Sequence, residues 1–97
     1  MRFEIILAPE AVEDRKRLRA YDRAAVDDAM ERCLRHEPHL VGKARVKRLR
    51  GLRRPQYRLR VDDLRVFYDV VDQEVHVLAI VAKADADAWI KDAGEPS

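Results

Sequence analysis

The stretch YRLRVDDLRVFYDVVDQEVHVLAIVA, Tyr57–Ala82, decides the fold, because apolar and polar residues alternate through most of it. This period of two predicts strands over residues 56–61, 64–71 and 75–82. Only Asp62 and Asp63 separate the first two strands, and Asp72 and Gln73 form the turn between the next two. Two-residue loops join antiparallel neighbours, so we expect two consecutive hairpins, although neither loop has the preferred glycine.

Counting back from the two turns predicts the cross-strand pairs. Val61 faces Leu64 and Tyr57 faces Tyr68 in the first hairpin, and Tyr68 also faces Val77 in the second. These residues form one continuous apolar face, which helices must cover. A slip of one residue would scatter that face, so the apolar pairs support this register.

The opposite face of the predicted hairpins gathers like charges. Arg60 falls directly opposite Arg65, and Arg58 lies diagonal to them, an arrangement that destabilises a sheet by some fraction of ~1 kcal/mol per pair. Either this face is simply solvated, or an anion lies between guanidiniums that can each bind a phosphate in bidentate fashion. We favour the anion site. The same face is predicted to carry Phe67, Asp69, His76, Leu78 and Ile80.

Asp69 and His76 are predicted to be cross-strand neighbours on that face. A carboxylate beside an imidazole can orient the ring for proton transfer. An ordinary surface pair explains the same two residues, and we prefer that interpretation.

The rest of the chain predicts helices around the hairpins. Phe3–Leu7 is a short apolar strand, and Pro9 is placed to begin a helix. Asp22 can cap a second helix, whose core stripe is Val26, Met30 and Leu34 and which ends before Pro38. Residues 39–44 form a loop, residues 83–93 a C-terminal helix, and about residues 93–97 a frayed tail. We expect one domain over residues 1–97.

Composition narrows the possible functions. The single cysteine, Cys33, excludes an internal disulfide and is more simply a packed apolar residue than a nucleophile. The three glycines form no phosphate-binding loop, and no Cys/His cluster has zinc spacing. No apolar run is long enough to span a membrane, and the N-terminus does not read as a signal peptide, so we expect a cytoplasmic protein.

The charge is distributed unevenly along the chain. Residues 43–65 hold ten Lys or Arg against two acids, whereas the remaining residues hold ten basic and sixteen acidic side chains. Such asymmetry indicates a polyanionic partner, most often a nucleic acid, or else a solvated basic face.

The motifs LRG and YRLRVDDLRVFYDVVDQEVHVLAIVAK, within Leu49–Lys83, resemble the RelE/ParE superfamily of type II toxins. The preceding strand and two helices agree in order and length. The resemblance implies an α+β fold, in which two N-terminal helices pack on a twisted, mainly antiparallel sheet of four to five strands with a short C-terminal helix.

The resemblance also implies alternative functions. RelE-like members are metal-independent endoribonucleases that cut ribosome-bound mRNA through attack of the 2′-hydroxyl, and they need no cofactor. ParE-like members inhibit DNA gyrase. A cognate antitoxin neutralises both kinds, so the expected partners are an antitoxin together with mRNA and rRNA, or with gyrase. A weakened member that only binds antitoxin or nucleic acid is a third possibility.

The family's catalytic basic residues match Arg58, Arg60 and Arg65 in this sequence. Beyond the last strand the chain departs from the pattern, because Ala84 replaces a usual arginine and Trp89 or Ile90 replaces a usual tyrosine. Lys83 could supply the missing charge. The resemblance and the charge together predict an RNA contact by Trp89, as a stacking surface unless it anchors the terminal helix. They also predict backbone contacts, or for some residues contacts with the acidic part of an antitoxin, by Lys47, Arg48, Arg50, Arg53 and Arg54.

Overall fold

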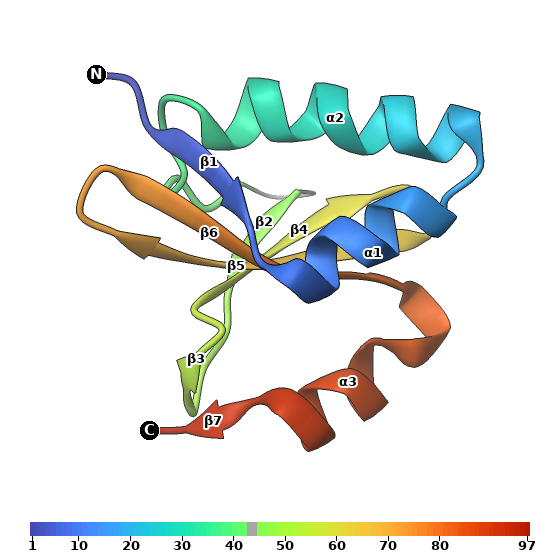
Figure 1. The fold of residues 1–97 in the computed structure, drawn as a ribbon. Coiled ribbons are helices and arrows are strands. Elements are labelled where there is room, and N and C mark those ends of the chain that lie inside the picture. The colour runs from blue at the N-terminus through green and yellow to red at the C-terminus, as the bar shows by residue number, and fades with distance from the viewer. Residues whose placement is uncertain (43–44) are drawn as a thin grey trace.

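The computed structural model describes residues 1–42 and 45–97, so Lys43 and Ala44 of the predicted loop lie outside the described residues. A five-stranded sheet lies between two layers of helix (Figure 1). Its strand order is β1-β6-β5-β4-β2, with only β1 parallel to its neighbour. The predicted α+β class is confirmed. The strands are β1 Glu4–Leu7, β2 Val46–Arg48, β4 Tyr57–Val61, β5 Leu64–Val71 and β6 Glu74–Ala82.

The two predicted hairpins are β4–β5 and β5–β6, and the sequence register holds near both turns. Arg60 pairs with Arg65 in the first hairpin, and Val70 pairs with Val75 in the second. Each turn places one aspartate at positive φ, Asp62 at 52° and Asp72 at 55°. Aspartate is enriched in this left-handed region, so these turns form without glycine.

A β-bulge in β6 overturns one prediction about the faces. Tyr68 pairs with Val77 as expected, but Phe67 pairs with Ala79, so Leu78 is an extra residue. The alternation of faces therefore reverses beyond Leu78. Ile80, which we predicted on the arginine face, pairs instead with Val66 and is buried in the core.

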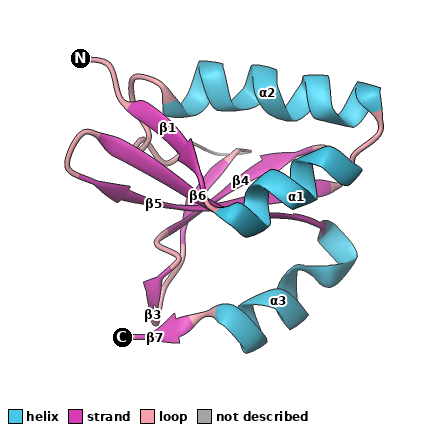
Figure 2. Ribbon diagram, in the orientation of Figure 1, coloured by secondary structure: helices cyan, strands magenta, loops and turns pink. Residues whose placement is uncertain are grey.

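The helices α1, Pro9–Arg17, and α2, Ala20–Leu34, cover the apolar face of the sheet (Figure 2). Tyr68 is fully buried there, and its hydroxyl donates a hydrogen bond of 2.7 Å to the Pro38 carbonyl. Burial raises the pKa of this phenol, so it stays a neutral donor. The remaining core includes Ala11, Val26, Ala29, Met30, Leu34, Leu59, Val66, Val75 and Val77.

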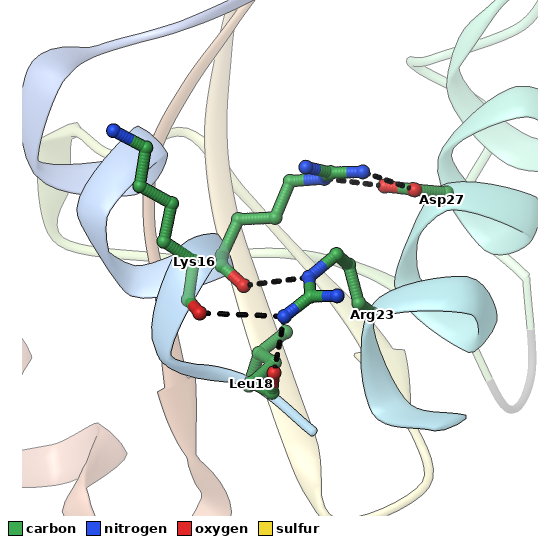
Figure 3. Close-up of polar contacts among 5 residues, drawn as sticks. Lys16, Leu18, Arg23 and Asp27 are labelled. Atoms are coloured by element: carbon green, nitrogen blue, oxygen red, sulfur yellow. Dashed lines mark hydrogen bonds and ion pairs between the residues drawn. The ribbon is translucent and has the colours of Figure 1, made fainter. Parts of the chain in front are cut away.

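Polar contacts fix the α1–α2 hairpin (Figure 3). The Arg23 guanidinium donates to the carbonyl oxygens of Arg15, Lys16 and Leu18 at the end of α1, at 3.3, 3.3 and 2.7 Å. Arg15 in turn binds both carboxylate oxygens of Asp27, at 2.8 and 2.6 Å. The bonds from Arg23 supply donors to carbonyls at the end of α1, where a helix runs out of backbone N–H partners.

The start of α2 differs from the prediction. The helix begins at Ala20 with Arg19 as the capping residue, so Asp22 lies inside the first turn instead of capping it. The Asp22 carboxylate lies 3.6 Å from the Arg19 Nε. A negative charge in the first turn still favours the helix dipole, which explains why the sequence signal was displaced by a few residues.

The C-terminal segment is also more ordered than predicted. A 3-10 turn, η1 Lys83–Asp85, leads into α3, Ala86–Ala93, and then β7, Glu95–Pro96, pairs with β3, Leu52–Arg54. The frayed tail that we expected is therefore a short strand, because β3 offers it a partner far away in the sequence. No helix among the described residues is long and apolar enough to cross a membrane.

Candidate functional site

Arg58, Arg60 and Arg65 form a cluster, here called the arginine cluster, on the sheet face opposite α1 and α2. Arg60 pairs directly with Arg65, and Arg58 pairs with Phe67, the next residue but one along β5. Because side chains alternate between the faces of a strand, all three begin on the same side. Lys47 of β2 pairs with Arg58 and adds a fourth cation to this face.

Arg65 is buried and held by the turn beside it. Its Nη1 donates to the backbone carbonyls of Asp62 and Leu64, both at 2.9 Å. These acceptors are neutral, so they orient the guanidinium without cancelling its charge.

Arg58 is half-buried, and its Nε is fully buried without a hydrogen-bond partner in the described part of the chain. Burial lowers the pKa of its guanidinium, and the nearby charges of Arg65 and Arg60 lower it further. No residue of the arginine cluster forms an ion pair with a described carboxylate. An orphaned buried donor between uncompensated cations is suited to receive an anion.

Asp69 and His76, considered from the sequence as a proton-transfer pair, each contact other groups instead of one another. Asp69 and His76 are cross-strand neighbours, as the register predicts. However, Asp69 accepts a hydrogen bond from the Gln56 backbone N–H at 2.7 Å and forms an ion pair with the Arg54 Nε at 3.0 Å, while His76 Nε2 lies 2.8 Å from Glu74. Each group is engaged elsewhere. Within residues 1–42 and 45–97, no three metal-binding side chains gather into a metal site.

Trp89 of α3 packs against the sheet beside the arginine cluster. Its ring stacks on Phe67 with centroids 4.7 Å apart and planes 6° apart, and its Nε1 donates to Glu10 at 2.7 Å. Trp89 thus anchors α3, the simpler of the two roles weighed from the sequence, and one ring face is covered. Lys83 and Ala84 are exposed in η1, where the Lys83 N–H donates to the Asp63 carbonyl at 2.7 Å.

The outer basic residues divide into two groups. Arg53 and Arg54 of β3 are paired with acids, Arg53 with Glu95 at 2.6 Å and Arg54 with Asp69. Lys47, Arg48 and Arg50 form no ion pair with a described residue. The Arg48 guanidinium lies 5.1 Å from the centre of the Tyr57 ring and donates to the Gln56 carbonyl.

Sequence reasoning overlooked Arg45 as a site residue. Its carbonyl accepts the Arg60 N–H at 2.7 Å, and it lines a hollow of about 580 Å³ together with Arg60, Arg32 and Asp28. This hollow lies between α2 and the end of β4. Membership in the basic segment was the only sequence signal, because Arg45 precedes the strands that the alternation defines.

Comparison with known proteins agrees with this architecture. A search of the curated proteins finds no match. Among solved structures, the RelB-RelE antitoxin-toxin complex from Methanococcus jannaschii contains a similar chain, with TM-score 0.68 and 19% identity over 87% of this chain and 96% of that one. The toxin-antitoxin complex RelBE2 from Mycobacterium tuberculosis gives 0.61 and 23%, over 84% and 99%.

A third similar structure is the YoeB dimer from Staphylococcus aureus, with TM-score 0.59 and 19% identity over 81% of this chain and 94% of that one. These likenesses establish the fold. The family model described as "ParE toxin of type II toxin-antitoxin system, parDE" matches residues 5–86, which include every strand of the five-stranded sheet but the first residue of β1. The chain therefore belongs to the ParE toxin family, a family of type II toxin-antitoxin toxins in the RelE/ParE superfamily.

Proposed function

We propose that this toxin is an endoribonuclease that cuts ribosome-bound mRNA, with the arginine cluster holding the phosphodiester to be cleaved. The observation that carries the proposal is the buried Nε of Arg58, which has no partner among the described residues and lies beside two further uncompensated arginines. Folding alone gives no reason to gather these charges, since like-charged cross-strand pairs destabilise a sheet. A bound phosphate removes the repulsion and supplies the missing acceptor.

In the proposed reaction the ribose 2′-oxygen attacks the adjacent phosphorus, and the bond from phosphorus to the 5′-oxygen breaks. The products are a 2′,3′-cyclic phosphate and a free 5′-hydroxyl. Arg58, Arg60 and Arg65 stabilise the negative charge that grows on the phosphate oxygens in the transition state. Arginine is a poor proton acceptor at neutral pH, so the 2′-hydroxyl proton passes to water or to the phosphate, and the departing 5′-oxygen takes up a proton from the same source. Lys83, which directly precedes Ala84 in the sequence, supplies the positive charge of the family's usual arginine in this proposal.

The basic residues without ion pairs extend the proposed RNA surface. Lys47, Arg48 and Arg50 contact the RNA backbone in this proposal, and these contacts are salt-sensitive and independent of sequence. The partner that blocks this surface is a cognate antitoxin, in keeping with the antitoxin-toxin complexes among the similar structures.

The test is expression of the chain without its antitoxin. We expect growth arrest accompanied by mRNA cuts that can be mapped at nucleotide resolution, and both should disappear in the Arg60→Ala, Arg65→Ala double variant. Arg53→Ala is the matched control, because it removes an arginine that is already paired with Glu95. Cuts that persist in the double variant refute the proposal.

A gyrase-directed toxin is the second candidate. The His76 imidazole and the Asp69 carboxylate, which share the sheet face of the arginine cluster, are engaged by other groups, and the matching family model is that of the ParE toxin. Growth arrest with intact mRNA and with DNA gyrase trapped on cleaved DNA would select this candidate. Harmless expression together with tight antitoxin binding would select a binding-only member.

A further inference from the structure

We propose that Arg54 is a positioning residue. It forms the ion pair with Asp69, so that Asp69 does not pair with the arginine cluster and neutralise its charge, and Arg54 does not itself contact the nucleic acid. The proposal rests on the proposed phosphate-binding role of the cluster and assigns Arg54 a different part from the RNA contact expected from the sequence. Three observations support it: the position of Asp69, the partners of Asp69, and the state of Arg58.

Asp69 is the one acid in β4 or β5 that shares a sheet face with the arginine cluster. Arg58 of β4 lies directly opposite Phe67 of β5, so its two diagonal neighbours on β5 are Arg65 and Asp69. Diagonal neighbours have their Cβ atoms about 7–8 Å apart, a separation that an arginine side chain can span. One diagonal neighbour of Arg58 is therefore a cation, and the other is a carboxylate within its reach.

The partners of Asp69 come from the chain that leads into β4. Asp69 is buried, its Oδ2 lies 3.0 Å from the Arg54 Nε, and its Oδ1 accepts the Gln56 N–H at 2.7 Å. The Gln56 side chain accepts the Val70 N–H at 2.9 Å, which fastens the same segment to β5 a second time. A buried carboxylate needs such partners, because an ionised group without them is costly to bury.

Arg58 forms no ion pair with Asp69 in this arrangement. Its Nε has no partner among the described residues, and the positive charges of Arg65 and Arg60 lower the pKa of its guanidinium. If Arg54 is removed, Asp69 loses its counter-charge and Arg58 is the nearest unpaired donor on the same face. The two should then pair, which would cancel the charge of Arg58 and occupy its free Nε.

The first experiment needs no ligand. The Arg58 Nε–Hε resonance is followed by NMR in the wild type, in Arg54→Gln and in the Arg54→Gln, Asp69→Asn double variant. We expect a downfield shift of the Arg58 proton in Arg54→Gln, because a carboxylate now accepts it, and a return to the wild-type position in the double variant. An unchanged Arg58 resonance in Arg54→Gln overturns the proposal. Amide spectra of each variant establish that it is folded.

The second experiment measures the affinity for a short single-stranded 2′-O-methyl RNA, which binds but cannot be cleaved. Arg54→Gln should weaken binding about tenfold, the size expected when a charge-assisted hydrogen bond is lost. Adding Asp69→Asn should restore the affinity to within about twofold of that of Asp69→Asn alone. If Arg54 contacts RNA directly, the double variant stays weak and the proposal is wrong.

Arg53→Gln is the matched control, since Arg53 is on the same short strand and is paired with an exposed acid, Glu95. It should weaken binding by no more than about threefold through long-range charge, and Asp69→Asn should give it no specific rescue. Arg58→Met separates the two proposals. If Arg58→Met leaves the affinity for the RNA unchanged, the proposed function fails. The NMR experiment still decides whether Arg54 keeps Asp69 from pairing with Arg58.

Discussion

The two faces of the central sheet differ in whether their buried polar groups have partners. On the face covered by α1 and α2, each buried side chain that the structure describes is apolar or has a hydrogen-bond partner, as Tyr68 does with the Pro38 carbonyl. On the face that carries the arginine cluster, Arg58 keeps a buried donor without a described partner, beside two like charges. The first face is arranged for stability, whereas the like charges and the unsatisfied donor on the second face cost stability, a cost that the proposed anion site would explain.

The largest effect is expected from breaking the covered face at Tyr68. Tyr68→Ala removes a fully buried ring and leaves the Pro38 carbonyl without its donor, so the free energy of unfolding should fall by about 3–5 kcal/mol. Urea denaturation measures this. Arg60→Ala, on the other face and exposed, should stay within about 0.5 kcal/mol of the wild type. A loss below about 1 kcal/mol in Tyr68→Ala would contradict this account of the core.

Arg58→Met sharpens the comparison by separating activity from stability. Methionine keeps much of the apolar stem and removes the orphaned donor, so the free energy of unfolding should stay the same or rise. The rate of RNA cleavage should fall by about 100-fold, the usual effect of losing one group that stabilises charge in the transition state. Quantified cleavage in a ribosome assay and urea denaturation give the two numbers. A variant that loses stability and activity together would place Arg58 in the structural framework instead.

A smaller effect is expected at the helical hairpin above the covered face. Arg23→Ala removes three hydrogen bonds to carbonyls at the end of α1, so the free energy of unfolding should fall by about 1–2 kcal/mol. Arg19→Ala, which removes a highly exposed arginine next to the same helix, serves as the control and should cost less than about 0.5 kcal/mol. Equal losses in the two variants would show that the carbonyl contacts contribute little.

The smallest effect is expected at the ion pair of Asp27 with Arg15. The Arg15 guanidinium holds the pKa of the Asp27 carboxyl below its usual value, so the folded state favours the ionised form. That contribution is present above the unfolded-state pKa, about 4, and is lost as the pH falls through the lower folded-state pKa.

Both side chains of the pair are more than a third exposed, so solvent screening limits the contribution at pH 7 to less than about 1 kcal/mol. The difference in unfolding free energy between the wild type and Asp27→Asn should therefore shrink as the pH is lowered below about 4. Urea denaturation at a series of pH values tests this. A difference that does not change with pH would mean that the ion pair makes no contribution.

Much of the arginine face could be predicted from the sequence because two short turns fix a register over many residues. The pairing of Arg60 with Arg65 and of Asp69 with His76 follows from counting back from Asp62–Asp63 and Asp72–Gln73. The predicted face of Ile80 was wrong because counting from a turn holds only while the strands pair residue for residue. A bulge adds one residue to one strand, and nothing in the local alternation of VHVLAIVA announces it.

Partners that are distant in the sequence could not be predicted. The pairing of β7 with β3, the stacking of Trp89 on Phe67 and the grip of Arg54 on Asp69 each join segments whose meeting depends on the whole fold. Arg54 shows the consequence most clearly. Its residue type and its basic neighbours indicated an RNA contact, whereas its place in the fold sets it against a buried carboxylate.

By itself, the sequence determined the family and the α+β class through its resemblance to known toxins. It also determined the hairpin register and the gathering of three arginines, because these depend on local alternation and on turns that contain no more than two residues. Only the tertiary structure decided which charges remain unpaired. Whether a guanidinium keeps its charge free depends on which carboxylates lie within about 4 Å of it, and chain segments far apart in the sequence supply them. Arg53 and Arg54 are taken by Glu95 and Asp69, while the arginine cluster is left without such a partner among the described residues.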